Sequence, residues 1–425
     1  MIYVHIPFCR SFCTYCDFYS EVASKCRRAE DDQLQSELFT GFSKALGREI
    51  ADRAGEMSDD VNTLYIGGGT PSVLPLSVYT SLMQDLASVG IRAPFDEFTF
   101  EVNPEDIVEK GGTYVEQLLE LGVNRISMGV QSFDDGILKW MNRRHDSRTA
   151  VNAYHILEDV GVDNISIDLI FGLSQLTDSK WEETLKRAME ISSKGVVPRH
   201  VSSYQLSVEP GSALARLVDR GVWQEASDEL CEGQYRILCK TLAGAGYHHY
   251  EISNFAQPGY EARHNSAYWA HVPYVGLGPA AHSFLAIGQA RCIPVAPSQP
   301  SWAPPPSRGW QNATSMHSAL PSHEKVSGVR QWNRDDLRAY IADPKAVQEY
   351  ETLEREQLVL ERIMLGLRTS EGLPADFLKC HCRPEALQTA LDNGDLVPSG
   401  VTNLRIPENR FFVSDAIILE LCAET

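Results

Sequence analysis

Three cysteines lie within eight residues near the start of the chain, at Cys9, Cys13 and Cys16. This CxxxCxxC spacing lets three thiolates hold one side of an iron–sulfur cubane, and the run contains no fourth cysteine. Structural zinc sites use four closed ligands, and electron-transfer clusters usually use four cysteines. Three ligands therefore predict a [4Fe–4S] cluster with one iron open to a substrate. A zinc site completed by His5 is the alternative.

The other seven cysteines are scattered through the 425 residues, which is not the pattern of a disulfide framework. Five of them are interpreted as ordinary thiols: Cys26, Cys231, Cys239, Cys292 and Cys422. Cys380 and Cys382 flank a histidine and could hold a metal, although a surface loop is the more ordinary interpretation.

Six short apolar or β-branched runs predict buried parallel strands. They are Ile2–Pro7, Thr63–Ile66, Phe98–Val102, Arg125–Val130, Ile165–Ile170 and Val201–Leu206. Helical patterns lie between them, at Glu30–Ala54, Tyr114–Gly122, Thr149–Gly161 and Trp181–Lys194. This alternation predicts an α/β fold of right-handed βαβ units. An open doubly wound sheet and a barrel-like (β/α) array both satisfy the pattern.

A polar residue or a glycine stands at or just after the end of each predicted strand. These positions are Cys9, Gly67–Thr70, Glu101, Gln131, Asp168 and Tyr204–Gln205. In both layouts functional groups gather at the carboxyl ends of the strands. Any one of these residues is explained by a cap or a buried hydrogen bond. Six together, one of them a cysteine cluster, predict one shared site.

Charge and hydropathy exclude several classes of function. The chain has 38 basic and 57 acidic residues, a net charge of −19, which argues against broad binding to nucleic acid. No apolar run reaches the roughly 18 residues that a membrane-spanning helix needs. The first residues lack the basic and apolar regions of a signal peptide, so we expect a cytoplasmic protein.

The chain is long enough for one large domain and a smaller one. Six prolines in residues 294–309 exclude a helix or a central strand there and predict an insertion or linker. A helical pattern that starts at Tyr350 and a last helix at Asp415–Ala423 predict a small α+β domain. The predicted division is 1–290, 291–330 and 331–425.

The cysteine motif after a first strand resembles the signature of the radical S-adenosylmethionine (SAM) superfamily. The longer string YVHIPFCxxxCxYCDF resembles the HemW-type haem chaperones and the related oxygen-independent coproporphyrinogen-III oxidases. Further strings agree, at Gly67–Ser72, Glu101–Glu105, Ser127–Phe133, Ser166–Leu173, Arg263–Trp269 and Gly276–Phe284. The resemblance covers nearly the whole chain except the proline-rich segment. It implies a partial (β/α)6 TIM-like barrel with a smaller C-terminal α+β domain.

The resemblance also implies that SAM binds the open iron of a cluster on the three cysteines. The residues at matching SAM-lining positions are Tyr3, Tyr15, Gly68, Gly69, Thr70, Glu101, Gln131, Arg143 and Asp168. Their chemistry is suitable, because glycines allow a ligand to approach the backbone and Glu101 can accept hydrogen bonds from SAM. Asp168 lies in an apolar strand and needs a partner, for which Arg143 or a ligand is a candidate. Arg144 and His145 are expected to be solvated.

Proteins of the HemW type bind haem, so the resemblance implies haem as a cofactor and a haem-requiring protein as a recipient. Haem needs an axial nitrogen and an apolar wall. His264, in the run RHNSAYW, offers an imidazole beside Tyr268 and Trp269. We therefore expect a haem contact at His264, with a histidine hydrogen-bonded in a packed loop as an equal alternative. His282 is a second candidate, and His248–His249 a third.

Two departures separate the chain from the oxidase branch. The oxidases continue the motif as CxxxCxxCxC, whereas Phe18 stands at the last of these positions. The oxidases also carry a segment before their first strand, which in this chain begins at Ile2. Both differences favour a haem chaperone, with the oxidase of porphyrin biosynthesis as the alternative. A third hypothesis, a radical SAM enzyme that modifies RNA, is disfavoured by the acidic charge.

Overall fold

The computed structural model describes residues 1–22, 29–57, 61–195, 197–287 and 327–422. The proline-rich segment 294–309, Cys26 and Cys292 lie outside these ranges. The contacts divide the chain into two compact units. The first comprises Met1–Tyr268, Val272–Phe284 and Gln331–Tyr350. The second comprises Trp269–His271, Leu285–Arg330 and Glu351–Thr425. The sequence grouped residues 331–350 with the C-terminal domain, and its three-part division stays a prediction.

A nine-stranded sheet forms the centre of the first unit, in the order β11-β1-β4-β5-β6-β7-β8-β10-β9. The six predicted strands are confirmed as neighbours in sequence order, and all five pairings between them are parallel. They are β1 (Ile2–Ile6), β4 (Thr63–Gly68), β5 (Glu97–Val102), β6 (Arg125–Gln131), β7 (Ile165–Phe171) and β8 (His200–Gln205). The flanking strands are β11 (Val275–Leu277), β10 (Asn254–Ala256) and β9 (His248–Glu251). The order is that of an open array rather than a closed barrel.

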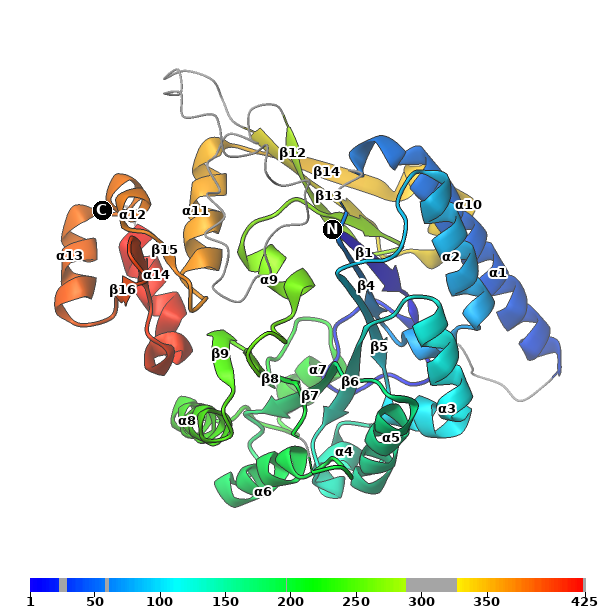
Figure 1. Ribbon diagram of the computed structural model, residues 1–425, viewed down its shortest axis with the longest axis horizontal. Helices are drawn as coiled ribbons and strands as arrows, with labels where there is room; N and C mark the ends of the chain where they lie inside the picture. The colour runs from blue at the N-terminus through cyan, green and yellow to red at the C-terminus, as the bar shows by residue number, and fades with distance from the viewer. Residues whose placement is uncertain (23–28, 58–60, 196, 288–326, 423–425) are drawn as a thin grey trace. The chain divides into compact units, whose positions relative to one another are not determined.

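Helices connect the parallel strands and lie along one side of the curved sheet (Figure 1). They are α1 (Ala29–Asp52), α2 (Leu76–Ser88), α3 (Pro104–Glu120), α4 (Asp135–Trp140), α5 (Ser147–Val160) and α6 (Asp178–Met189). The sequence missed α2 and α4 and placed the start of α3 too late. The glycine stop of α5 is confirmed, because Gly161 caps it in the left-handed conformation.

The remaining elements of the first unit include two small sheets, one of β2 and β3 and one of order β12-β13-β14, and further helices. They are β2 (Phe8–Cys9), β3 (Glu21–Val22), α7 (Ala213–Asp219), α8 (Asp228–Gly244), α9 (Arg263–Trp269), β12 (His282–Ile287), β13 (Ser327–Asn333), α10 (Leu337–Ala342) and β14 (Gln348–Leu353), some of which cross the unit boundary. The helix predicted from Tyr350 is wrong at its start, because β14 occupies those residues.

The described part of the second unit contains four α-helices and a three-stranded sheet of order β15-β17-β16. Its elements are α11 (Arg355–Gly366), β15 (Leu373–Pro374), α12 (Ala375–His381), α13 (Pro384–Asp392), β16 (Val397–Ser399), β17 (Asn403–Arg405) and α14 (Ser414–Cys422). This composition confirms a separate α+β region. Cys380 is exposed at the end of α12 and Cys382 is buried beside Cys422. The Cys380–Cys382 run therefore ends a helix rather than forming a loop.

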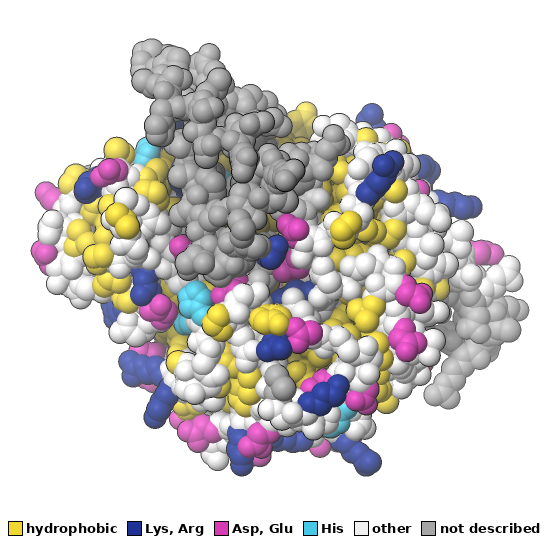
Figure 2. Space-filling view, viewed as in Figure 1, with side chains coloured by type: hydrophobic (Ala, Val, Ile, Leu, Met, Phe, Trp, Pro, Cys, Tyr) yellow, Lys and Arg dark blue, Asp and Glu magenta, His cyan; other side chains and the backbone are white. Residues whose placement is uncertain are grey.

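The surface carries charges of both signs. On the face shown in Figure 2, Lys and Arg side chains are scattered among Asp and Glu rather than gathered in one patch. Among the described residues, no helix combines the length and the low polarity that crossing a membrane requires.

Glu49 on α1 ties this helix to segments far away in the chain. Its buried carboxylate accepts hydrogen bonds from Gly278 N at 2.8 Å, Asn333 Nδ2 at 2.8 Å and the Tyr340 hydroxyl at 2.7 Å. Arg53 Nη1 adds an ion pair at 3.2 Å. A buried charge is stable only when it is paired and hydrogen-bonded. This network therefore holds the segment Gln331–Tyr350 against α1 and the Gly278 turn, within the first unit.

We predict that Glu49→Ala strongly destabilises the first unit. Removing the carboxylate leaves three donors without this acceptor and leaves the buried Arg53 with Glu56 as its remaining carboxylate partner, which costs about 3 kcal/mol. The midpoint of urea denaturation should fall accordingly. Glu37→Ala, on the exposed side of the same helix, is the matched control and should shift the midpoint little. Equal midpoints for the two variants would contradict the role of the network.

Candidate functional site

A cavity of about 660 Å³ opens at the carboxyl ends of the parallel strands and extends into the first unit. Its lining includes the predicted cluster ligands, the predicted SAM contacts and the first haem candidate: Tyr3, Cys9, Cys13, Tyr15, Cys16, Gly68, Gly69, Thr70, Glu101, Gln131, Arg143, Asp168 and His264. The structure thus brings the cysteine run, the glycine turn and the strand-end polar residues to one place.

The segment that carries the cysteines is held by the sheet at one side and by α4 at the other. Gly69 N donates to Ile6 O at 2.8 Å and Thr70 N donates to Phe8 O at 2.6 Å, which extends the β1–β4 pairing up to Cys9. On the other side, Thr14 N donates to Met141 O at 3.0 Å. The cysteine segment is therefore positioned by backbone hydrogen bonds of the protein itself.

Glycine is required in the turn after β4, because two neighbours approach its backbone closely. A Cβ atom on Gly69 would lie 2.6 Å from Phe8 O, and one on Gly68 would lie 2.5 Å from the His5 ring. Gly68 also has a φ of +101°, a conformation that side chains disfavour. The turn thereby exposes its backbone to the cavity and places Thr70 Oγ1 3.3 Å from Cys9 Sγ.

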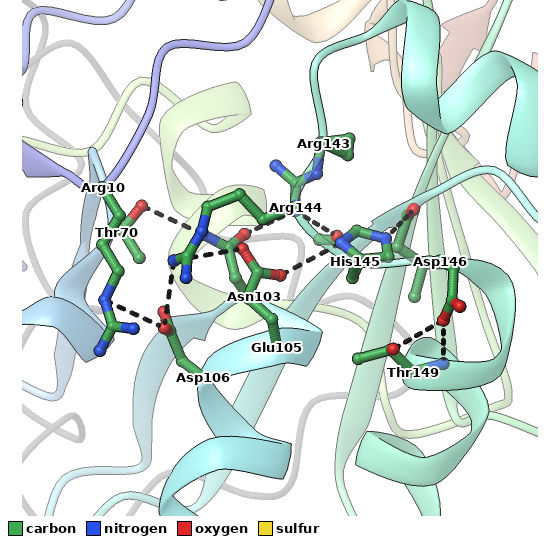
Figure 3. Close-up of polar contacts among 12 residues, drawn as sticks. Arg10, Thr70, Asn103, Glu105, Asp106, Arg143, Arg144, His145, Asp146 and Thr149 are labelled. Carbon is green, nitrogen blue, oxygen red and sulfur yellow. Dashed lines mark hydrogen bonds and ion pairs between the residues drawn. The ribbon is translucent and has the colours of Figure 1, made fainter.

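Asn103 links the glycine turn to the arginine beside the cysteines. Its amide donates to Thr70 Oγ1 at 3.1 Å, and its Oδ1 accepts from Arg143 Nη2 at 2.6 Å (Figure 3). Arg143 also donates to Gly129 O at 2.8 Å and to Cys13 Sγ at 3.5 Å. Arg143 therefore places a positive charge beside one of the three predicted cluster ligands. Asn103 was not singled out in the sequence, although it stands in the string EVNPE.

Glu101 and Asp168 are acids deep in the cavity. Glu101 accepts from the Tyr65 hydroxyl at 2.6 Å and from Gly68 N at 3.1 Å. Burial raises the pKa of Glu101 to about 7 and that of Asp168 to about 6. Asp168 accepts from Ser127 Oγ at 3.2 Å and is also hydrogen-bonded to Ser202, so its direct partners are hydroxyls, while Arg143 acts on it through space. The pKa values of both acids therefore lie near neutral pH, so each carboxyl group can gain or lose a proton there.

Gln131 ends β6 in an unusual backbone conformation. Its φ is +66°, and the pairing of β6 with β7 shifts register between Gly129 and Gln131. A positive φ at a residue other than glycine costs energy and often marks a functional position. The bulge aims Gln131 into the cavity, where it is one of the lining side chains.

The zinc alternative required His5 as a fourth ligand. In the structure both nitrogens of the buried His5 ring are engaged, Nδ1 with the Tyr3 hydroxyl at 3.0 Å and Nε2 with Tyr19 O at 2.9 Å. No group of three or more His, Cys, Asp or Glu side chains in the described ranges is arranged to hold a single ion. Thiolates of a cubane bind different irons and so lie farther apart than ligands of one ion. The arrangement therefore disfavours zinc and is compatible with a cluster.

His264 lies in the cavity wall but is enclosed by partners. It is 1% exposed, and its Nδ1 and Nε2 lie 2.9 Å from Thr63 Oγ1 and 3.0 Å from the Tyr268 hydroxyl. Burial lowers the pKa of His264 to about 3, so the ring is neutral at physiological pH. Binding iron would require the loss of one of these hydrogen bonds. The haem contact at His264 stays a prediction.

The other histidine candidates lie outside this cavity. His282 is exposed and stacks on Trp332, and His249 stacks on Phe255 with ring centres 4.0 Å apart. His248 pairs with Glu261 at 3.4 Å.

The expectation for the two residues after Arg143 is only half correct. Arg144 is exposed and lies about 4 Å from Glu105 and Asp106 (Figure 3). His145 is buried, with hydrogen bonds to Glu105 Oε2 at 3.2 Å and to Val130 O at 3.0 Å. The solvated position predicted for His145 is wrong, because its ring packs under the end of β6.

Comparison with known proteins now identifies the family. Residues 3–188 match the radical SAM superfamily. A protein named haem chaperone HemW from Synechocystis is 34% identical, over 67% of this chain and 65% of its own length. The protein of the same name from Bacillus subtilis is 34% identical, over 69% and 73%. The chain belongs to the HemW family of radical SAM proteins.

Membership of this family implies a [4Fe–4S] cluster and SAM. The solved structure of coproporphyrinogen III oxidase (HemN) from Escherichia coli resembles this fold over 99% of the chain and 89% of its own, with a TM-score of 0.70 and 20% identity. This likeness confirms the radical SAM fold and says nothing further about activity. The chain spans only 65% of the length of the Synechocystis relative, so the activity and partners of that protein are not transferred to this chain by similarity alone.

We predict that replacing Cys9, Cys13 or Cys16 by serine abolishes cluster assembly. Each thiolate holds one iron of a cubane that has only three protein ligands. Iron and sulfide analysis after anaerobic reconstitution should fall from about four atoms of each per chain to near zero. Cys239→Ser, a thiol outside the cavity, is the control and should retain the cluster. Retention of a full cluster by any triad variant would refute the assignment.

We predict that Glu101→Gln reduces the loss of stability as pH rises. The folded chain binds a proton on Glu101 up to about pH 7, whereas the unfolded chain releases it near 4.5. Raising the pH through this window therefore destabilises the wild type, by at most about 3 kcal/mol. Urea midpoints measured from pH 5 to pH 8 should fall less steeply for the variant. Parallel curves for both proteins would contradict the raised pKa.

Proposed function

We propose that the chain is a haem chaperone, which binds haem and delivers it to a haem-dependent recipient protein. The observation that carries this proposal is the 34% identity, over about two thirds of the chain, to relatives named haem chaperone HemW. Phe18 supports it, since this residue replaces the last cysteine of the oxidase motif. The proposal includes a cytoplasmic location and no nucleic-acid partner.

The proposed cluster ligands are Cys9, Cys13 and Cys16, and SAM would occupy the cavity beside them. When bound, the cluster and SAM supply one-electron chemistry. The exposed backbone of Gly68, Gly69 and Thr70 would hold the methionine end of SAM. The remaining proposed SAM contacts are Tyr3, Tyr15, Glu101, Gln131, Arg143 and Asp168. Their positions in the lining of one cavity support this set.

His264 is the proposed axial contact for haem. Its low pKa supports the proposal, because the neutral imidazole is the form that binds a metal. Tyr268 holds Nε2 in the absence of haem, so this hydroxyl would have to release the ring. Binding of haem to His264 would therefore have to break the hydrogen bond between His264 Nε2 and the Tyr268 hydroxyl.

We predict that adding haem to the purified, reconstituted chain produces a Soret band that saturates. His264→Ala should shift this band and weaken binding, because an axial nitrogen is lost. Tyr268→Phe is the matched variant, and it should bind haem at least as tightly as wild type because Nε2 is already free. Absence of haem binding by the wild type would sink the proposal. Unchanged spectra in His264→Ala would reject this ligand alone.

The oxidase remains the second candidate because its solved structure shares the fold. The same preparation, incubated anaerobically with SAM, a reductant and coproporphyrinogen, distinguishes the two. A chaperone leaves the substrate unchanged while its cluster is intact. Formation of the decarboxylated product would favour the oxidase.

A further inference from the structure

The cavity has a floor far below the cysteines. Its lining includes Arg125 and His200, the first residues of β6 and β8, and Ser166 near the start of β7. A strand rises about 3.3 Å per residue, so the backbone of Arg125 lies roughly 20 Å from that of Gln131 at the opposite end of β6. The proposed SAM and cluster residues account for the upper part of this space, and the floor has no assigned occupant.

Arg125 is a buried charge without an ionic partner. Its side chain is 2% exposed, and Nη1 donates to Asn164 Oδ1 at 2.9 Å and to Tyr260 O at 3.2 Å. Over the described ranges, no Asp or Glu forms an ion pair with it, and Nε and Nη2 donate to no acceptor. Burying a charge without a counter-ion is costly. Such a group points to an anion supplied from outside the protein.

The neighbouring side chains do not supply this anion. His200 is held between Ser166 Oγ at 2.8 Å and the Tyr250 hydroxyl at 2.7 Å, and burial lowers its pKa, so it is neutral. Asp168 is engaged by Ser127, and its charge acts on Arg125 only through space. Among the described residues, the guanidinium of Arg125 at the floor of the cavity therefore has a positive charge and no carboxylate in direct contact with it.

The free atoms of Arg125 have the geometry of a carboxylate receptor. Nε and Nη2 form the side edge of the guanidinium, where two parallel N–H groups match the two oxygens of one carboxylate. Neither atom is sealed inside the protein, so the space that they face is the cavity. Lysine at this position would offer a point charge rather than a fork.

We propose that Arg125 anchors a carboxylate at the floor of the cavity. Resting on the function proposed above, the source of this carboxylate is a propionate of haem. A small organic acid offers the same chemistry, and the experiment separates these two sources. In either case Arg125 is a binding residue below the SAM region, distinct from the cysteine and glycine segments.

The test compares haem with haem dimethyl ester, which lacks both free carboxylates, on the wild-type reconstituted chain. We expect the ester to bind about 10- to 100-fold more weakly than haem, the effect of losing a charged hydrogen-bonded pair. Arg125→Gln should weaken haem binding by a similar factor and leave the affinity for the ester unchanged. Arg236→Gln, an exposed arginine paired with Glu232, is the matched control and should behave as wild type.

The comparison of haem with its dimethyl ester uses the wild-type chain alone. It therefore remains informative even if circular dichroism shows that Arg125→Gln does not fold. If the wild type binds haem, and binds the ester equally tightly, the proposal that a haem propionate binds Arg125 is overturned, whereas haem binding itself is not. Absence of haem binding would instead contradict the proposed function. A thermal shift of wild type, but not of Arg125→Gln, by succinate would assign the site to a small acid. No response to either class would overturn the carboxylate site.

Discussion

The pairing of β1 with β4 is the interaction on which the site depends. Two hydrogen bonds, from Gly69 N and Thr70 N, continue this pairing beyond the strands and bring Cys9 to the rim of the cavity. Only glycine fits at positions 68 and 69, because the carbonyls of the cysteine segment and the His5 ring leave no room for a side chain. The cysteine run and the glycine turn therefore form one unit, although some 55–60 residues separate them in the chain.

Charge inside the cavity is arranged in layers. Arg143 lies beside Cys13 at the upper end, the acids Glu101 and Asp168 lie in the middle, and Arg125 lies at the floor. Hydroxyl and amide groups separate these layers, so within the described residues none of the four groups forms a direct ion pair with another. A polar interior of this kind suits ligands that carry several charged groups along their length.

Much of the architecture was predictable because the buried parallel strands read as apolar runs, and all six were found in order. Helix α4 was missed because its six residues are too few to show a period. Helix α2 was missed although its buried residues Val78, Tyr79, Leu82 and Leu86 follow a helical spacing. The helix predicted at Glu30–Ala54 is confirmed as α1, in which Phe42, Leu46 and Ile50 are buried and Leu34 is exposed. The enclosure of His264 and the isolation of Arg125 depend on contacts between distant residues, which no local pattern reveals.

The cysteine segment is anchored by hydrogen bonds to other parts of the first unit. Its anchors are Gly69, Thr70, Thr14 and Asn142, whose hydrogen bonds belong to the polypeptide alone. In small zinc domains the metal supplies the free energy of folding, and chain and metal order together. In this chain the pairing of β1 with β4 and the end of α4 contribute these anchors, so the path of the cysteine segment is set by the same contacts that build the sheet.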